Sequence, residues 1–134
     1  PVTGAVIVTT PQDIALLDAR KGVKMFEKVN VPVLGLVENM SIHVCSNCGH
    51  AEPIFGSGGG EKMAQEYGLP FLGALPLDIR IRKETDSGTP TVVAEPEGPI
   101  AARYRDIARR VALALARAPR DLSHKFPTVV VQNR

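Results

Sequence analysis

Apolar residues gather in three short runs within the amino-terminal part of the chain, at residues 4–9, 31–37 and 70–75. The first run is short and β-branched, which is typical of a strand buried on both faces of a parallel sheet, and the other two runs predict a second and a third strand. Helical patterns fill the gaps between the runs, which gives two successive β-α-β units with right-handed crossovers. The sequence therefore predicts an α/β fold with a partial, doubly wound, mostly parallel sheet flanked by helices.

The first predicted helix follows Thr10 and Pro11, which suit an N-cap and a first helical position, and it ends at Asn30. Its predicted buried stripe consists of Ile14, Leu17, Met25 and Val29. Short helices are predicted at 61–67 and 79–85. A longer amphipathic helix is predicted from apolar residues three or four positions apart: Ile100, Tyr104, Ile107, Val111 and Leu115.

These elements form one predicted domain over residues 1–134, with a cysteine-bearing loop at 41–60 and a C-terminal tail at 119–134. Within the tail, residues 128–131 fit either a last edge strand or an ordered extension. Because the chain starts at Pro1 and leads directly into an apolar run, we expect it to be part of a longer protein.

The composition is that of an ordinary globular domain, with 44% hydrophobic residues, 22% charged residues and a net charge of +2. Basic side chains gather near the carboxyl terminus, but the arginine-rich segment 103–120 offers only Tyr104 for stacking, so we expect no nucleic-acid partner. The apolar runs are far shorter than the ~18 residues of a membrane span, and no signal peptide is recognisable. We therefore expect a cytoplasmic chain without a membrane partner.

Three positions follow the predicted strands: Thr10 with Pro11 after the first, Asn39 after the second, and Pro76 with Asp78 after the third. Ligands of open α/β sheets bind outside the carboxyl ends of the strands. The Asn39 amide suits the edge of a purine, and the Asp78 carboxylate can accept from an amine or a ribose hydroxyl. Asn and Asp are also ordinary turn formers, so both interpretations stay open here.

The loop at 41–60 carries both cysteines, Cys45 and Cys48, in a Cys-x-x-Cys spacing that can grip one metal atom. The residues after Cys48 make a poor helix start, which disfavours thioredoxin-like chemistry. Zinc with His43 and His50 as further ligands would need four ligands within eight residues. Two chains with two thiolates each could instead share a [4Fe–4S] cluster or a zinc ion. A structural disulfide is the remaining alternative, which the lack of secretory signals disfavours.

The glycine-rich run at 56–60 precedes the predicted 61–67 helix and lacks the Gly-Lys-Ser/Thr ending of a P-loop. It fits a flexible entry loop better than an anion cradle, although its amides could face an anion.

Several motifs in one order resemble the Mrp/ApbC family of iron-sulfur cluster carriers, deviant P-loop ATPases related to MinD and to the nitrogenase iron protein. The resemblance runs from Gly4 to Ala116, and the ending 125–132 is similar to the terminus of some members. Its motifs are residues 4–12, 19–22 and 35–40, the Cys45/Cys48 pair, and residues 54–60 and 73–78.

The resemblance implies a homodimer in which Cys45 and Cys48 of each subunit hold a bridging [4Fe–4S] cluster that is passed to apo iron-sulfur proteins. It also implies that Asn39 and the Pro76–Asp78 segment contact the adenine of ATP. The family's Walker A loop and its Asp-x-Pro-Pro-Gly-Thr switch segment do not occur in these residues, so we expect the carboxyl-terminal portion of such a protein, unable to hydrolyse ATP alone.

Two alternatives use the same residues differently. The first is a dimerisation or interaction module in which Cys45 and Cys48 hold zinc, or no metal. The second is a MinD-like spatial regulator, which would need a membrane-binding amphipathic tail that residues 122–134 do not supply.

Overall fold

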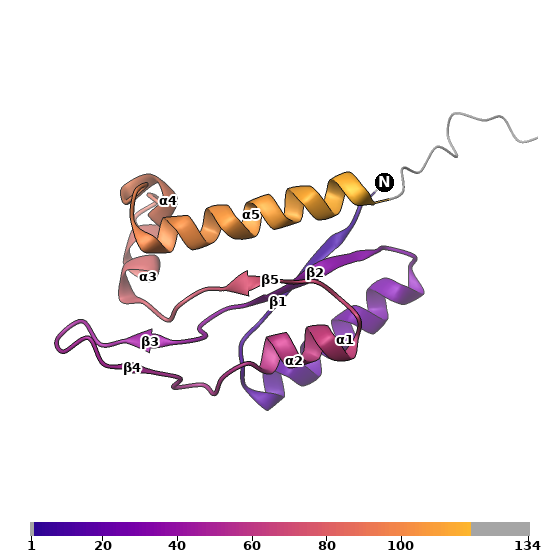
Figure 1. Ribbon diagram of the computed structural model, residues 1–134, viewed down its shortest axis with the longest axis horizontal. Helices are drawn as coiled ribbons and strands as arrows, with labels where there is room; N and C mark the ends of the chain where they lie inside the picture. Colours follow the sequence, from indigo (N-terminus) through magenta and orange to yellow (C-terminus); the bar gives the residue numbers. More distant parts are fainter. Residues whose placement is uncertain (1, 119–134) are drawn as a thin grey trace, which may run out of the picture.

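The structure is a computed structural model that describes residues 2–118. Its main sheet consists of three parallel strands in the order β1 (Ala5–Thr9), β2 (Val33–Glu38) and β5 (Phe71–Ala74). Helices α1 (Asp13–Lys28) and α2 (Gly59–Glu66) cover one face of the sheet, and α5 (Pro99–Arg117) covers the other (Figure 1). The predicted fold class is confirmed.

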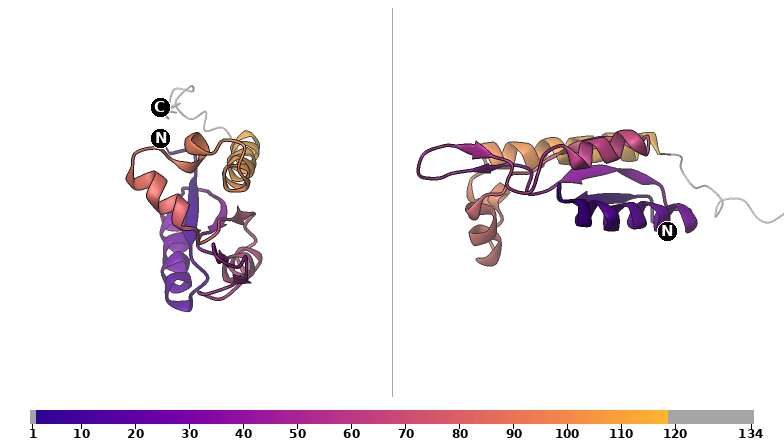
Figure 2. Two further views of the ribbon diagram at one scale, coloured as in Figure 1. Left: turned by 90° about the vertical axis from the view of Figure 1, so that its left-hand side faces the viewer. Right: turned by 90° about the horizontal axis from the view of Figure 1, so that it is seen from below.

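Two smaller units complete the described part of the chain. Helices α3 (Ile79–Asp86) and α4 (Thr91–Ala94) connect β5 with α5. Strands β3 (His43–Val44) and β4 (Ala51–Glu52) form an antiparallel ribbon that projects beyond the main sheet (Figure 2). The ribbon lies inside the segment 41–60 that the sequence predicted as an irregular loop, and α4 was not predicted.

The core has two layers, one on each face of the sheet, because alternate side chains of β2 point to opposite faces. Leu36 belongs to the cluster beneath α1 and α2, with Leu16, Val23 and Met63. Val37 belongs to the cluster beneath α5, with Leu72 and Leu75. β2 is therefore buried on both faces.

The first strand differs from the prediction on one face. Val8 of β1 is 58% exposed, whereas Ile7 and Thr9 are buried. Val6, on the same side of β1, packs against the cluster beneath α5, but this helix lies over β5 and β2 and leaves Val8 open within residues 2–118. The prediction of a first strand buried on both faces is wrong for this part of the chain.

The predicted inner stripe of α1 is also wrong. Its four members are exposed by 52–71%: Ile14, Leu17, Met25 and Val29. Leu16 and Val23 face the sheet instead, and Ala19 and Phe26 pack beside them. Both sets recur at helical spacing, so periodicity alone could not decide between them.

The helix ends agree only in part with the predicted caps. α1 begins at Asp13 with Gln12 at the N-cap position, and the Thr10 hydroxyl donates a hydrogen bond to the side-chain oxygen of Gln12. Asn30 follows the helix end with a left-handed φ of 56°, as its predicted role requires. The apolar stripe of α5 is confirmed, except that Leu115 is 40% exposed.

Each helix described between residues 2 and 118 is too short or too polar to span a bilayer. The predicted tail at 119–134, including the possible strand at 128–131, lies outside the described residues.

Candidate functional site

The carboxyl ends of the three parallel strands lie together at one edge of the sheet. The backbone N–H of Asn39 donates to the Thr9 carbonyl at 2.7 Å, and the backbone N–H of Leu75 donates to the Glu38 carbonyl at 2.8 Å. The Ser41 amide in turn donates to the Leu75 carbonyl at 2.9 Å. The structure therefore places Asn39 between the end of β1 and the segment that follows β5.

Asn39 is half-buried at this edge and lines a surface hollow that it shares with Thr9 and Thr10. Its side-chain oxygen accepts a hydrogen bond from the Met40 amide at 2.9 Å. Among residues 2–118, its amide nitrogen donates to no protein acceptor, so this nitrogen is the part of the side chain left to donate to a ligand.

Asp78 has a structural task at the same edge. Its Oδ1 accepts from the Arg80 amide at 2.8 Å, which caps the N-terminus of α3. The Arg80 guanidinium donates to Oδ1 at 3.1 Å and to Oδ2 at 2.8 Å. These hydrogen bonds to Arg80 hold the pKa of the Asp78 carboxyl below its usual value. A base or ribose that bound Asp78 would have to share oxygens already engaged by Arg80.

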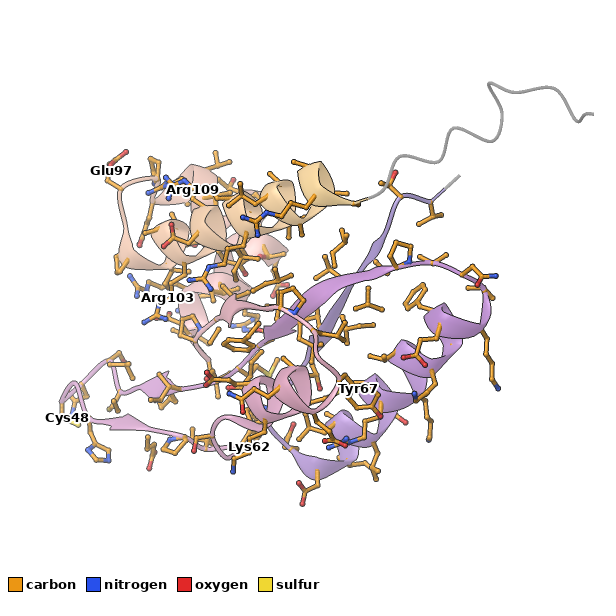
Figure 3. The ribbon with its side chains drawn as sticks, turned by 45° about the vertical axis from the view of Figure 1, so that its right-hand side comes forward. Cys48, Lys62, Tyr67, Glu97, Arg103 and Arg109 are labelled. Atoms are coloured by element: carbon orange, nitrogen blue, oxygen red, sulfur yellow. The ribbon has the colours of Figure 1, made fainter. Side chains whose placement is uncertain are left out.

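The Cys45–Cys48 segment forms the tip of the β3–β4 ribbon. The Cys45 amide donates to the His50 carbonyl at 2.9 Å, and the Gly49 amide donates to the Cys45 carbonyl at 2.8 Å. Gly49 has φ 72°, a left-handed conformation that favours glycine and allows the tight turn. Figure 3 shows Cys48 at the outer end of the ribbon, away from the body of the molecule.

Both cysteines are free thiols, which does not support the disulfide alternative. Cys45 is half-buried and Cys48 is exposed. The backbone N–H groups of Asn47 and Cys48 and the Cys48 thiol point at the Cys45 sulfur and lower the pKa of the Cys45 thiol. The thiolate, which is the form that binds metals, is therefore favoured at Cys45.

The two histidines near the cysteines do not join them in a cluster. Among residues 2–118, no group of three or more potential metal ligands comes together. His43 is bound elsewhere, because its Nδ1 lies 3.1 Å from the Leu77 carbonyl oxygen. The Leu77 amide donates to the Ile42 carbonyl at 2.9 Å, so the base of the ribbon is joined to the Pro76–Asp78 segment.

Sequence reasoning missed one side chain of this region. The Glu38 carboxylate is buried beside Asn39 and accepts hydrogen bonds from Ser41 and Gly60. Glu38 was visible only as the residue before Asn39, and nothing in the sequence connects it with a glycine 22 positions later. The amide of Gly60 therefore faces an internal carboxylate.

Comparisons with known proteins agree with the predicted family. The sequence model of the ParA group described as "NUBPL iron-transfer P-loop NTPase" matches residues 1–112. The iron-sulfur cluster carrier protein of Escherichia coli K12 is 64% identical over 115 residues, which cover 86% of this chain and 31% of that protein. The mouse iron-sulfur cluster transfer protein NUBPL is 51% identical over 119 residues, covering 89% and 37%. The chain thus spans about a third of these relatives.

Solved structures show the same arrangement of helices and strands. A nucleotide-binding protein of Archaeoglobus fulgidus in complex with ADP has a TM-score of 0.58 and 36% identity, covering 73% of this chain and 39% of that chain. The cell division ATPase MinD of Pyrococcus furiosus has a TM-score of 0.63 and 25% identity, covering 83% and 43%.

Proposed function

Because this chain belongs to the family of NUBPL iron-transfer P-loop NTPases, we propose that it carries an iron-sulfur cluster as cargo and delivers it to apo iron-sulfur proteins. In this proposal Cys45 and Cys48 bind a [4Fe–4S] cluster together with the same two cysteines of a second copy. The observation that carries the proposal is the pair of free thiols at the tip of a projecting ribbon. An exposed tip is accessible both to a second copy and to a recipient.

A second chain supplies the ligands that one chain lacks. A [4Fe–4S] cluster takes four cysteine thiolates, and each chain offers two. Two copies related by a two-fold axis can therefore complete the ligand set at the axis. The lowered pKa of the Cys45 thiol supports this use, because thiolates rather than thiols bind iron.

The surface around the thiols supports a homodimer at this place. Three apolar residues on or next to the ribbon are exposed: Ile42 before β3 by 40%, Val44 in β3 by 47% and Ile54 after β4 by 52%. Apolar side chains gathered on a projecting hairpin are typical of a surface that another protein covers. Face-to-face ribbons would bury them beside the cluster and keep water away from it.

The strand-end edge supports a nucleotide role for Asn39 and the Pro76–Asp78 segment. We propose that the Asn39 side-chain nitrogen, which has no protein acceptor among residues 2–118, and backbone groups of this segment contact the adenine of ATP, which the longer protein binds with Mg²⁺. Asp78 contributes less to the base than to the cap of α3, since both its oxygens already accept from Arg80. Asn39→Ala should weaken binding of an adenine nucleotide to the longer protein, measured by calorimetry.

We further propose that the protein works in the cytoplasm.

Anaerobic reconstitution with iron and sulfide tests the cluster assignment. The Cys45→Ala/Cys48→Ala protein should lose the visible thiolate-to-iron absorbance and about four irons per dimer. Ser46→Ala is the matched control, because it alters the same turn and keeps both thiols. If the double variant retained as much iron as the parent, the assignment of Cys45 and Cys48 would be wrong.

A zinc-bound dimerisation module without cluster transfer is the second candidate. The observation that favours it is the pair of free thiols on this chain, because the two thiolates and those of a second copy would also suit tetrahedral zinc. Metal analysis of aerobically purified protein separates the two. About one zinc per dimer, not replaced by iron during reconstitution, would favour the zinc module.

A further inference from the structure

Glu38 is the only charged residue among residues 2–118 that is buried, with 2% of its surface exposed. Removing a carboxylate from water is costly unless hydrogen bonds or an opposite charge compensate it. A position at the end of β2 could instead hold an apolar residue at no such cost. The contacts of this carboxylate must therefore compensate the cost of its burial.

The two oxygens of the Glu38 carboxylate hold the two ends of the cysteine-bearing segment. Oε1 accepts from the Ser41 hydroxyl at 2.6 Å, at the start of the segment. Oε2 accepts from the Gly60 amide at 2.7 Å, at its end. Gly60 lies in the first turn of α2, where free N–H groups and the helix dipole favour a negative charge. One side chain thus closes the segment 41–60 at its base.

The glycines at the end of the segment make this closure possible. A Cβ on Gly60 would lie 3.1 Å from the Glu38 Cβ and 3.2 Å from its Oε2. A Cβ on Gly59 would lie 2.7 Å from the Leu16 Cδ1 and 2.9 Å from the Pro11 carbonyl oxygen. The start of α2 can therefore approach β2, Pro11 and the Leu16 side chain of α1 because these positions have no side chain.

We propose that Glu38 is a positioning residue, whose carboxylate pins both ends of the cysteine-bearing segment and so orients the ribbon that presents Cys45 and Cys48 to the second copy. This inference rests on the proposed function of those cysteines. The carboxylate lies at the base of the ribbon and touches neither thiol, so its effect is on the direction of the ribbon. A ribbon held at both ends loses less conformational freedom when it meets its counterpart.

The same residue also belongs to the strand-end edge through its backbone. The Glu38 carbonyl accepts from the Leu75 amide, and the next residue, Asn39, is bonded to Thr9. The ribbon is thereby fixed relative to the edge at which Asn39 and the Pro76–Asp78 segment lie. Loosening the carboxylate contacts should free the Gly60 end of the cysteine-bearing segment and increase the motion of the ribbon, while its Ile42 end stays bonded to Leu77. The parallel sheet should persist, because separate backbone hydrogen bonds hold it.

The test compares variants in the protein expressed from its complete coding sequence. Glu38→Ala removes both contacts, and Ser41→Ala removes one. Glu38→Gln keeps both, since its oxygen can accept from Gly60 while its amide donates to the Ser41 oxygen. Glu61→Ala removes an exposed carboxylate from the same turn of α2 and serves as the control for charge. Val23→Ala, in the core beneath α1, serves as the control for lost stability.

The first measurement is amide hydrogen exchange in the metal-free protein. Glu38→Ala should accelerate exchange at Gly60 and in the ribbon at least about tenfold, as expected when hydrogen bonds to a charged acceptor are lost. Exchange at Leu36 in β2 should change much less. Glu38→Gln should restore most of the protection, and Val23→Ala should not single out the ribbon.

The second measurement is the rate at which the reconstituted cluster is lost to an iron chelator. Glu38→Ala should lose the cluster roughly tenfold faster than the parent, and the rate in Ser41→Ala should rise by a smaller factor. Three variants should lose the cluster at nearly the parental rate: Glu38→Gln, Glu61→Ala and Val23→Ala. Unchanged ribbon exchange and unchanged cluster loss in Glu38→Ala would overturn the inference. If Glu38→Ala does not fold, Ser41→Ala decides by the same two criteria. A parent that binds no cluster would refute the proposed function, while hydrogen exchange would still decide the role of Glu38.

Discussion

Gly22 and Gly59 both lie in helices, and the same substitution to alanine should have opposite effects at the two positions. Gly22 lies in the interior of α1, where a Cβ would meet only the Ile7 Cδ1 at 3.6 Å, an ordinary van der Waals distance. Alanine in a helix interior is more favourable than glycine by about 0.5–1 kcal/mol. Gly22→Ala should therefore raise the free energy of unfolding by about that amount.

At Gly59, the first residue of α2, the added Cβ would lie 2.7 Å from the Leu16 Cδ1 and 2.9 Å from the Pro11 carbonyl oxygen. The leucine can turn away, but the carbonyl belongs to the backbone and can move only with the chain. Overpacking of this kind costs about 1–3 kcal/mol. Gly59→Ala should lower the free energy of unfolding accordingly, so the two variants should differ by roughly 1.5–4 kcal/mol.

Equilibrium unfolding in urea measures both variants against the parent. The midpoint should move up for Gly22→Ala and down for Gly59→Ala, with a similar slope, because neither change alters the surface exposed on unfolding. A Gly59→Ala protein as stable as the parent would show that α2 does not begin against Pro11 and Leu16. A clear loss of stability in Gly22→Ala would show that a Cβ at this position does not fit beside the Ile7 Cδ1.

Three further predictions rest on the burial of Leu16 and on the lowered pKa values of Cys45 and Asp78. Leu16→Ala should destabilise the protein by about 2–5 kcal/mol and Leu17→Ala by less than about 1 kcal/mol in urea unfolding, because only Leu16 faces the core; equal losses would contradict the orientation of α1. In the metal-free Cys48→Ala protein, alkylation of Cys45 should reach half its maximal rate at a lower pH than in the urea-unfolded chain, because the backbone N–H groups of Asn47 and residue 48 favour the thiolate; identical pH profiles would refute this. Asp78→Ala should cost about 0.5–2 kcal/mol at pH 7 through loss of the α3 cap. Because the folded-state pKa of Asp78 is lowered, its contribution is complete above the unfolded-state value of about 4 and disappears as the pH falls through the lower folded-state value. The difference between parent and variant should therefore shrink in acid, and a difference independent of pH would contradict the charged cap.

Local patterns in the sequence decided most of the elements. Residues 4–9 and 31–37 could be predicted as strands because short, mostly aliphatic runs suit the buried strands of a parallel sheet. β2 is such a strand, and its neighbours β1 and β5 run parallel to it, as predicted. Asn30 could be predicted as a helix end because asparagine tolerates the left-handed conformation found there. These features depend on residues close together in the chain.

Part of the candidate site could also be predicted from residues close together in the chain. Cys45, Cys48 and Gly49 lie within five residues, and the turn that they form is closed by the hydrogen bond from the Gly49 amide to the Cys45 carbonyl. The strand-end positions of Asn39 and Asp78 followed from the strand pattern. The binding of a cluster by Cys45 and Cys48 and of adenine by Asn39 and Asp78 remains a prediction. The boundaries of the cysteine-bearing loop at 41–60 and of the C-terminal tail at 119–134 also remain predictions.

Only the tertiary structure decided which of two equally periodic stripes of α1 packs against the sheet. Leu16 and Val23 are buried there, whereas Leu17 and Met25 are exposed. The tertiary structure also brought the Glu38 carboxylate to the Gly60 amide, a contact between residues 22 positions apart. The physical reason is common to both. Periodicity fixes the direction of side chains relative to their own helix or strand, whereas the burial of a stripe and the partner of a carboxylate depend on how separate elements pack.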